Sequence, residues 1–463
     1  MPLHTDAHQA HPDDDRLSFR PQFAEELEGD VPRNQLPSEM MPAATAYQIV
    51  HDELMLDGNA RLNLATFVTT WMEPEAARLM AECADKNMID KDEYPQTAEL
   101  ERRCVNMLAR LWNASGGEDA TGCSTTGSSE ACMLGGLALK WRWRARTHSA
   151  GGQPNLVMGS NVQVCWEKFC RYFDVEPRLV SVGPDVAHLT ADAAAAHCDE
   201  NTIGVVAVLG STYDGAYEPV EEICGALDRL ASSGGPDVPV HVDGASGAMV
   251  APFLDPDLRW DFRLDRVQSI NTSGHKYGLV YPGVGWVVWR DAAALPDELV
   301  FKVDYLGGEM PTFALNFSRP GAQVAAQYFN FLRLGEAGYR AIQQACRDTA
   351  AWLSGEIGRC DEYKLVSSEN GIPLVAFRCA DDVPFSVYDV SEALRSRGWL
   401  VPAYPMPPGM EDISVLRIVV RNGLSRDLAR LVMNDLDSVT SRLSRRPPAR
   451  AEADPQERAG FHH

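Results

Sequence analysis

The sequence predicts an α/β protein with a large domain on a mainly parallel sheet and a smaller C-terminal α+β domain. Three observations lead to this prediction. Short, continuously apolar runs recur through the middle of the chain, as is typical of strands covered on both faces. Helical stretches separate several of these runs and suit crossover connections. After about residue 350 the apolar runs become shorter and alternate with amphipathic segments.

An N-terminal arm comes first, and we assign residues 1–60 to it. Its opening part is rich in Pro, Asp and His, and the one element expected there is a short helix near Phe23–Leu27. Two amphipathic helices are then predicted at Glu99–Trp112 and Ala131–Arg146, the first because its apolar residues recur with the 3.6-residue period.

The large domain is expected to span residues 61–350. Its predicted buried strands are Asn155–Met158, Ile203–Leu209, Val238–Val242, Arg266–Asn271 and Gly285–Trp289. A long helix that leaves this layer is predicted at Gln323–Leu334.

The small domain is expected to span residues 351–445, with a polar tail over 446–463. Its predicted strands are Leu374–Arg378, Leu400–Ala403 and Val415–Val420, and its helices Val387–Arg397 and Asp427–Leu443.

Composition excludes several classes of protein. The 463 residues carry 42 Lys and Arg against 65 Asp and Glu, a net charge of −23, which argues against nucleic acid as a partner. The N-terminus has no apolar signal region, and no apolar run is long enough to span a bilayer, so we expect a cytoplasmic protein without a membrane partner. The 11 cysteines show no zinc-type spacing, so no metal is expected, and they are typical of a reducing compartment.

Two strand ends carry candidate catalytic residues. Lys276 follows the predicted strand Arg266–Asn271 within Ser273–Lys276, and lysine forms Schiff bases with aldehyde cofactors. Asp243 ends another apolar strand, at the edge of an α/β sheet where ligands bind, and it can keep a ring nitrogen protonated. Each residue alone is also compatible with an ordinary turn, but together they favour a pyridoxal phosphate site.

A third motif supplies the phosphate end of such a site. Thr125–Glu130 contains the Gly-Ser-Ser turn that opens the predicted helix up to Arg146. Free N–H groups at a helix N-terminus bind phosphate, although Ser128 or Ser129 would serve equally well as a simple helix cap.

With these three motifs the chain resembles the group II pyridoxal phosphate decarboxylases, and within them glutamate decarboxylase of the bacterial and plant type. The resemblance runs from about Ala46 to Leu443. It is carried by LDGNARLNLATF (56–67), NMIDKDEYPQ (87–96), RCVNMLARLW (103–112), GSSEACMLGGLALKWRWR (127–144), WDFRLDRVQSI (260–270), LVFKVDYLGG (299–308) and FALNFSRP (313–320). It implies the fold of pyridoxal phosphate-dependent transferases of fold type I, with a seven-stranded sheet.

The resemblance also implies cofactor-binding roles. Lys276 would form the internal aldimine, Asp243 would pair with the pyridinium nitrogen, and Ala245 and Gln163 would cover the two ring faces. Thr212 would lie near the ring phenolate. The implied phosphate ligands are Ser128, Ser129, His275 and, from a second subunit, Ser318.

Substrate residues are implied in the same way. Arg417 would hold the α-carboxylate of L-glutamate, and Tyr305 would lie on a loop over the site. The residues implied for the distal carboxylate are Thr66, Phe67, Asn87 and Asp90. The implied reaction is α-decarboxylation of L-glutamate through a quinonoid intermediate to 4-aminobutyrate and carbon dioxide, consuming one proton.

Two alternatives stay open at this stage. One is another acidic or aromatic amino-acid decarboxylase of the same group, and the other is a cofactor-binding protein without turnover. Intact Lys276, Asp243 and Arg417 speak against the second.

Two expectations concern pH. Asp90 beside a substrate carboxylate predicts that binding strengthens as pH falls, because two like charges meet unless one is protonated. Acid-stress members of the family end in Phe and a histidine that blocks the site at neutral pH. The end here is Gly460-Phe461-His462-His463, so His462 or His463 is the candidate switch, and a loose tail is the alternative.

Departures from the family limit the remaining inferences. Glu167 stands where acid-stress members often have His, which puts halide activation in doubt. The N-terminal arm differs, which leaves a hexamer open. An obligate homodimer is still implied, with Ser318 and Phe67 expected across its interface. The tail lacks the Trp and Lys of plant members, so calmodulin is not inferred as a partner.

Overall fold

A computed structural model describes residues 34–114, 117, 119–147, 152–183, 186–303, 310–367 and 370–445. The chain divides into two units, residues 1–59 and 60–463. In the first unit, helix α1 (Ala43–Leu54) buries none of its side chains. The helix expected near Phe23–Leu27 lies outside the described residues.

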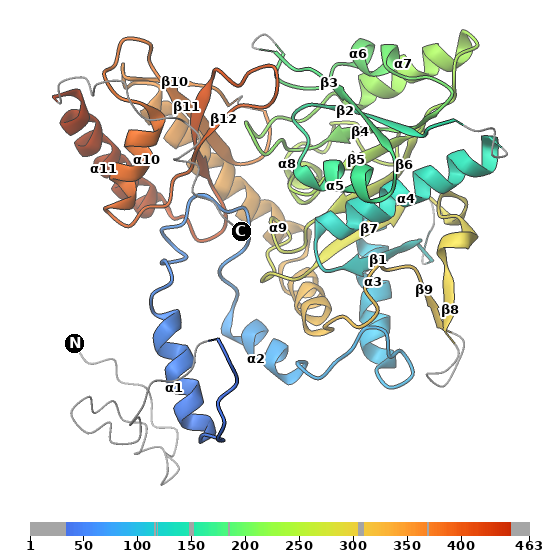
Figure 1. Ribbon diagram of the computed structural model, residues 1–463, viewed down its shortest axis with the longest axis horizontal. Helices are drawn as coiled ribbons and strands as arrows, with labels where there is room; N and C mark the ends of the chain where they lie inside the picture. The colour runs from blue at the N-terminus through green and yellow to red at the C-terminus, as the bar shows by residue number, and fades with distance from the viewer. Residues whose placement is uncertain are drawn as a thin grey trace. The chain divides into compact units, whose positions relative to one another are not determined.

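A seven-stranded sheet organises the large part of the second unit (Figure 1). Its strand order is β1-β7-β6-β5-β4-β2-β3, and β7 alone runs antiparallel to its neighbours. The strands are β1 (Gly122–Thr125), β2 (Asn155–Gly159), β3 (Glu176–Val180), β4 (Thr202–Val208), β5 (Val240–Asp243), β6 (Val267–Thr272) and β7 (Gly285–Trp289). The mainly parallel seven-stranded sheet that we expected is therefore confirmed.

Strand β4 shows why the sequence of this sheet is continuously apolar. Side chains alternate between the two faces of a strand. Val205 and Ala207 pack into the core on one face, whereas Val206 and Val208 pack into a separate core on the other. Because helices cover both faces, neither set reaches water, and the strand carries no polar alternation.

Two helices of this part precede β1, and the others come after it in the chain. They are α2 (Pro74–Glu82), α3 (Pro95–Leu111), α4 (Ser128–Thr147), α5 (Val164–Tyr172), α6 (Ala191–Ala196), α7 (Val220–Ser232) and α8 (Ala251–Leu254), with short 3₁₀ turns at Gly247–Met249, Ala292–Ala294 and Asp297–Leu299. The helices expected at Glu99–Trp112 and Ala131–Arg146 are α3 and α4. Helix α4 packs along the sheet against β4, β5, β6 and β7.

A second sheet carries the C-terminal part of the chain. Its order is β10-β11-β13-β12, with β10 (Tyr363–Leu365), β11 (Leu374–Cys379), β12 (Ala403–Pro405) and β13 (Ser414–Val419), all paired antiparallel. Helices α10 (Val387–Arg395) and α11 (Arg426–Ser444) enclose a core separate from that of the seven-stranded sheet. The strand expected at Leu400–Ala403 is wrong in position, because β12 begins only at Ala403.

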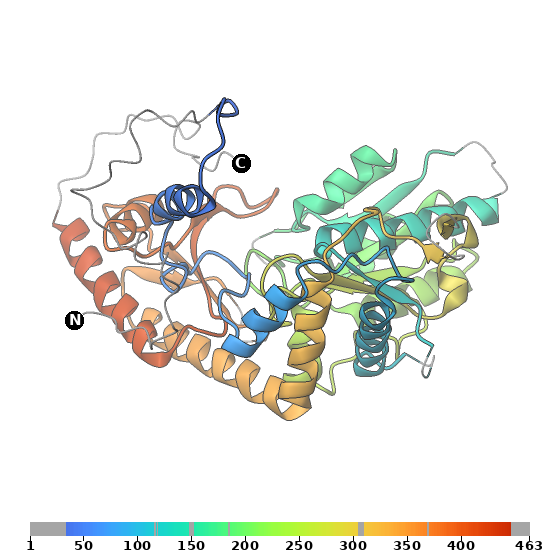
Figure 2. The same ribbon diagram turned by 90° about the horizontal axis from the view of Figure 1, so that it is seen from below.

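Helix α9 (Ala322–Ile357) contacts elements of both parts, α2 and α3 at one end and β11 and α11 at the other (Figure 2). It is kinked at Gly335, where φ is 53°. Glycine adopts this left-handed conformation without a steric penalty. The predicted helical run Gln323–Leu334 therefore forms the first segment of a longer helix.

Two strands of the large sheet were not predicted. β1 consists of Gly, Cys, Ser and Thr, and β3 is an edge strand whose side chains are mostly exposed. Neither gives an apolar run. The short pair β8 (Phe301–Val303) and β9 (Met310–Thr312) was also not predicted.

No helix among the described residues is long and apolar enough to cross a membrane. All 11 cysteines are free.

Candidate active site

A cavity of about 350 Å³ lies where four neighbouring parallel strands end. Its walls follow the carboxyl ends of β2, β4, β5 and β6 and the N-terminus of α4, the edge of an α/β sheet at which ligands bind. The lining residues are Thr126, Gly127, Ser128, Ser129, Glu130, Asn161, Gln163, Cys165, Val208, Gly210, Thr212, Asp243, Ala245, Ser246, His275 and Lys276. Eight of the nine residues expected at the cofactor are in this set, and Ser318 is the exception.

Lys276 lies three residues beyond Ser273 in the turn after β6. Its Nζ is 3.5 Å from the hydroxyl of Ser246, and the hydroxyl of Thr69 donates to its backbone carbonyl at 2.6 Å. Burial lowers the pKa of the amine from its ordinary value, although the nearby negative charge of Asp243 acts in the opposite direction. A lysine with a lowered pKa is more easily converted to the free amine that attacks a carbonyl carbon.

Asp243 ends β5 and is buried. One carboxylate oxygen, Oδ2, accepts the indole N–H of Trp166 at 2.8 Å. The other, Oδ1, accepts the side-chain N–H of Asn271 and the backbone N–H of Ala245, both at 3.1 Å. A carboxylate has about four acceptor positions, so these three donors leave one for a ligand.

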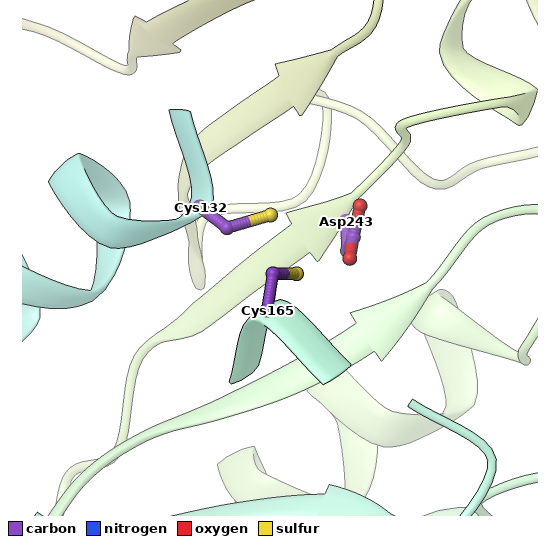
Figure 3. A group of neighbouring side chains, drawn as sticks. All are labelled: Cys132, Cys165 and Asp243. Atoms are coloured by element: carbon purple, nitrogen blue, oxygen red, sulfur yellow. The ribbon is translucent and has the colours of Figure 1, made fainter. Parts of the chain in front are cut away.

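Two thiols lie beside this carboxylate (Figure 3). The sulfur atoms of Cys132 and Cys165 and an oxygen of Asp243 all lie within 4.8 Å of one another. Burial raises the pKa of the Cys132 thiol well above its ordinary value. Thiols bind metal ions as thiolates, so this burial and the three donors already directed at Asp243 disfavour a metal ion here.

The N-terminus of α4 forms the opposite end of the cavity. The hydroxyl of Ser273 donates to that of Ser128, the first residue of the helix, at 2.8 Å. Gly127 lies against the ring of His275, since a Cβ added there would be 3.0 Å from Cε1. The free N–H groups and the dipole of the helix favour an anion at this point.

His275 supplies a neutral donor to the same end. Its Nδ1 accepts the backbone N–H groups of Gly283 and Val284 at 3.4 and 3.3 Å. Burial is the main cause that lowers its pKa to about 4, and the charge of Lys276 adds to it. The ring is therefore neutral near pH 7, and its proton is left on Nε2.

Gln163 lies at the N-terminus of α5, where its side-chain oxygen accepts the backbone N–H of Cys165 at 2.6 Å. Thr212 and Ala245 line the cavity after β4 and β5. The structure thus brings these three residues to the same cavity as Lys276 and Asp243.

Arg417 reaches the site from β13 of the second sheet and is buried. Its Nη1 donates to the carbonyl of Thr212 at 2.7 Å and its Nη2 to that of Ala65 at 2.8 Å. Its buried Nε has no hydrogen-bond partner among the described residues. A buried donor without a partner costs free energy, and an anionic ligand would remove that cost.

Thr66 and Phe67 lie next to Arg417. The ring centroid of Phe67 is 4.7 Å from the guanidinium carbon of Arg417 and 5.5 Å from Nζ of Lys276 in the same chain. The expectation that Phe67 enters across a subunit interface is therefore wrong. Segment 60–66 is held by its own chain. Asn63 pairs with Leu400 in an isolated β-bridge, and the guanidinium of Arg421 donates to three backbone carbonyls of the segment.

Asn87, Asp90 and Ser318 form a separate group. The amide of Asn87 donates to the hydroxyl of Ser318 at 3.3 Å, and its oxygen accepts the backbone N–H of Arg319 at 3.2 Å. None of the three lines the cavity of its own chain. Tyr305, His462 and His463 lie outside the described residues.

Several residues at the site were not predicted from the sequence. Trp166 and Asn271 hold Asp243, and Asn161, Cys165 and Ser246 line the cavity. The available signal was weak, namely a polar residue at the end of an apolar strand, as for Asn271 in β6.

A model of the pyridoxal-dependent decarboxylase conserved domain matches residues 37–380. The chain therefore belongs to the pyridoxal-dependent decarboxylase family, in agreement with a sheet edge that carries a lysine, an aspartate and a helix N-terminus.

Its relatives are more specific. The chain is 53% identical over 444 residues to a glutamate decarboxylase of Aliivibrio fischeri, covering 95% of each chain. It is 49% identical to a glutamate decarboxylase of Petunia hybrida, covering 90% of this chain and 84% of the relative. The solved structure of glutamate decarboxylase from Lactobacillus brevis superposes with a TM-score of 0.87 at 44% identity, over 91% of this chain and 98% of the other.

The cofactor of this family is pyridoxal phosphate, and the residues of the cavity fit it. The amine of Lys276 with its lowered pKa suits the aldehyde. The one acceptor position left on Asp243 suits a protonated ring nitrogen. The N-terminus of α4 with the neutral His275 suits the phosphate.

Proposed function

We propose that the protein removes the α-carboxylate of L-glutamate, releasing carbon dioxide and 4-aminobutyrate and consuming one proton. The observation that carries the proposal is that Lys276 and Asp243 line one cavity, while Arg417 of the second sheet donates to the carbonyl of Thr212 in the wall of that cavity. The glutamate decarboxylases that are about half identical to the chain support the choice of substrate.

The chain's residues would hold the cofactor by both ends. Lys276 would bind its aldehyde carbon, and Asp243 would keep its ring nitrogen protonated. Ser128, Ser129 and the Nε2–H of His275 would bind the phosphate. Gln163 and Ala245 would contact the two ring faces, and Thr212 the ring oxygen. When bound, the cofactor supplies an electron-withdrawing ring that accepts the electron pair left on the α-carbon as carbon dioxide departs.

Arg417 would orient the α-carboxylate. The bond that breaks would have to be oriented correctly for the chemistry that the cofactor would supply, so the site has to fix the direction of the carboxylate as well as attract it. The two Nη atoms are already committed to the carbonyls of Thr212 and Ala65, which immobilises the guanidinium. Each Nη atom keeps a second N–H, and the Nε–H has no partner among the described residues, so donors remain for a two-point contact with the substrate carboxylate.

The proton that replaces carbon dioxide must reach the α-carbon. Lys276 lies in the cavity, and we assign it together with Tyr305 to this delivery. The low-polarity wall formed by the Phe67 ring beside Lys276 and Arg417 would exclude water from this region.

The distal carboxylate of glutamate would be bound by residues from two chains. Phe67, which follows Thr66, lies 5.5 Å from Nζ of Lys276 and 4.7 Å from the guanidinium carbon of Arg417 in the same chain. Asn87 and Ser318 hydrogen-bond to each other instead, and neither they nor Asp90 line that chain's cavity. We therefore propose a homodimer in which a second chain supplies the last three residues. Exposed Leu315 and Phe317 beside Ser318 support an interface at this loop.

Subunit complementation tests the homodimer. Lys276→Ala and Asn87→Ala proteins should each have little activity. If the two are unfolded together and refolded as a mixture, half of the chains form mixed dimers with one intact site each, and activity should return to about a quarter of the wild-type value. Activity that stays at the level of the separate variants would refute a shared site.

The remaining assignments concern physiology and organisation. A reaction that consumes a proton suits acid resistance or a 4-aminobutyrate pathway, and we propose that it takes place in the cytoplasm. The boundaries at residues 60, 350 and 445 remain our division of the chain into arm, large domain, small domain and tail. His462 or His463 remains the proposed switch at neutral pH.

The decisive experiment measures 4-aminobutyrate released by the purified protein with pyridoxal phosphate from pH 4 to 8. L-Glutamate is compared with L-aspartate and L-tyrosine, and Lys276→Ala is the control variant. Release from glutamate alone, lost in the control, is the expected result. Release from another amino acid, or none at all from a protein that shows the visible absorption of bound cofactor, would refute the proposal.

A further inference from the structure

Behind Asp243 lies a line of buried polar side chains that the catalytic assignments do not use. His241 is two residues earlier on β5 and is fully buried. Its Nε2 is 2.8 Å from Oδ1 of Asn271, and its Nδ1 is 2.7 Å from the hydroxyl of Ser269. Asn271 and Ser269 both lie on the neighbouring strand β6.

The hydrogen bonds of this line have one consistent direction. The side-chain N–H of Asn271 donates to Oδ1 of Asp243, so the amide oxygen of Asn271 faces His241 and must accept. His241 therefore carries its proton on Nε2, and its Nδ1 accepts from Ser269. In the order Ser269, His241, Asn271, Asp243, each group donates to the next.

The surroundings of His241 keep its ring neutral, with the proton on Nε2. Burial lowers the pKa of His241 to about 4, so the ring is neutral above that pH and each ring nitrogen keeps its role. The ring of Trp166 packs edge-on against His241 at 5.1 Å, while the indole N–H of the same residue donates to Oδ2 of Asp243. On the other side lies Gly135 of α4, where an added Cβ would be 2.5 Å from Cε1 of His241.

We propose that His241 and Asn271 are positioning residues, which lock the amide of Asn271 with its N–H toward Asp243 and so direct the last acceptor position of Asp243 at the ring nitrogen of the cofactor. If the amide of Asn271 were turned over, its oxygen would face the carboxylate, repel its charge and displace it. The charge of the carboxylate and the donor at Nε2 both oppose this rotation, and His241 supplies the second of these two contacts. The inference rests on the proposed role of Asp243 in the same site.

Two substitutions at His241 separate the donor from the volume of the ring. His241→Gln keeps an N–H near the position of Nε2, whereas His241→Leu fills similar space without a donor. Ser269→Ala removes one hydroxyl at the far end of the line. Tyr363→Phe is the matched control, since it also deletes a buried hydrogen bond, to Thr440, but in the core of the second sheet.

The readouts are the dissociation constant of pyridoxal phosphate, from titration of the apoprotein by visible absorbance, and the kcat and KM for glutamate. A buried acceptor that loses its donor, as Oδ1 of Asn271 would here, typically changes an equilibrium by about tenfold. For His241→Leu we expect the dissociation constant to rise and kcat to fall by about tenfold each, with KM within threefold of wild type. His241→Gln should recover most of the loss, Ser269→Ala should show about a threefold effect, and Tyr363→Phe should show none.

Three results would overturn the inference. The first is a cofactor affinity and kcat of His241→Leu within twofold of wild type, and the second is equal damage in His241→Gln and His241→Leu. The third is equal damage in Tyr363→Phe, which would mean a general loss of stability. If His241→Leu does not fold, Asn271→Ser takes its place with the same thresholds. Because cofactor affinity does not depend on the substrate, it tests the inference even if glutamate proves to be the wrong substrate.

Discussion

Glu218 offers a direct test of how burial controls charge beside the active site. It is buried at 3% exposure in the segment between β4 and α7, just before α7 begins. Its Oε2 accepts the backbone N–H of Val208 at 2.7 Å, and its Oε1 accepts the backbone N–H of Leu189 at 3.0 Å and the amide of Asn161, which lines the cavity, at 2.9 Å. These donors favour the charged form, but burial outweighs them and, with the charge of Asp214, raises the pKa to about 7.

The consequence is a stability that depends on pH. A carboxyl group whose pKa is about 7 in the folded protein and about 4.5 when exposed binds its proton more tightly in the folded state. Its contribution is therefore complete below pH 4.5 and is lost as pH rises to 7. One pKa unit is worth about 1.4 kcal/mol, so the loss amounts to about 3 kcal/mol.

Glu218→Gln removes this dependence because glutamine does not titrate. We expect the difference in unfolding free energy, wild type minus Glu218→Gln, to fall by about 3 kcal/mol between pH 4.5 and 8. Equilibrium urea unfolding of the holoprotein at constant ionic strength, followed by tryptophan fluorescence, measures it. Glu167→Gln, which removes a carboxylate at an exposed residue of α5, is the control and should not reproduce the fall of about 3 kcal/mol. A constant difference for Glu218→Gln, or one that rises with pH, would refute the reasoning.

Three further predictions concern the substrate and the tail. Arg417→Lys keeps the charge but loses the fixed planar group of donors, so the KM for glutamate should rise about tenfold or more while cofactor affinity, titrated in parallel, stays unchanged; a fall in cofactor affinity instead would place Arg417 elsewhere in the mechanism. Asp90→Asn should flatten the increase of apparent glutamate affinity as pH falls, measured as KM from pH 4 to 7, and an unaltered profile would exclude Asp90 as the cause. Deletion of His462 and His463 should keep the visible absorption of the cofactor in its active form above pH 6, and an unshifted transition in a pH titration would exclude a tail switch.

The second sheet explains why Arg417, which comes late in the sequence, lies next to the wall of the cavity. β13 pairs with β11 and β12, and this places Arg417 under the carbonyls of Thr212 and Ala65. The rings of Phe67 and Tyr404 lie 4.7 and 5.2 Å from its guanidinium carbon. Such contacts stabilise a buried cation, so the arginine is held in place before any substrate arrives.

The sequence by itself determined the fold class and the catalytic residue types. Apolar runs such as Ile203–Leu209 predict strands buried on both faces, because only a residue pattern without polar alternation can be covered twice. Asp243 and Lys276 each follow such a run, and parallel strands end at the same edge of a sheet, so their meeting could be predicted as well.

Only the tertiary structure decided which residues surround that pair. Edge strand β3 and the polar strand β1 carry no local signal, and their place depends on pairing with β2 and β7. The donors that hold Asp243 come from α5 and β6, and Phe67 proved to contact its own chain's Lys276 rather than a partner's. Contacts between residues distant in sequence depend on how the elements pack, and local periodicity contains no information about that packing.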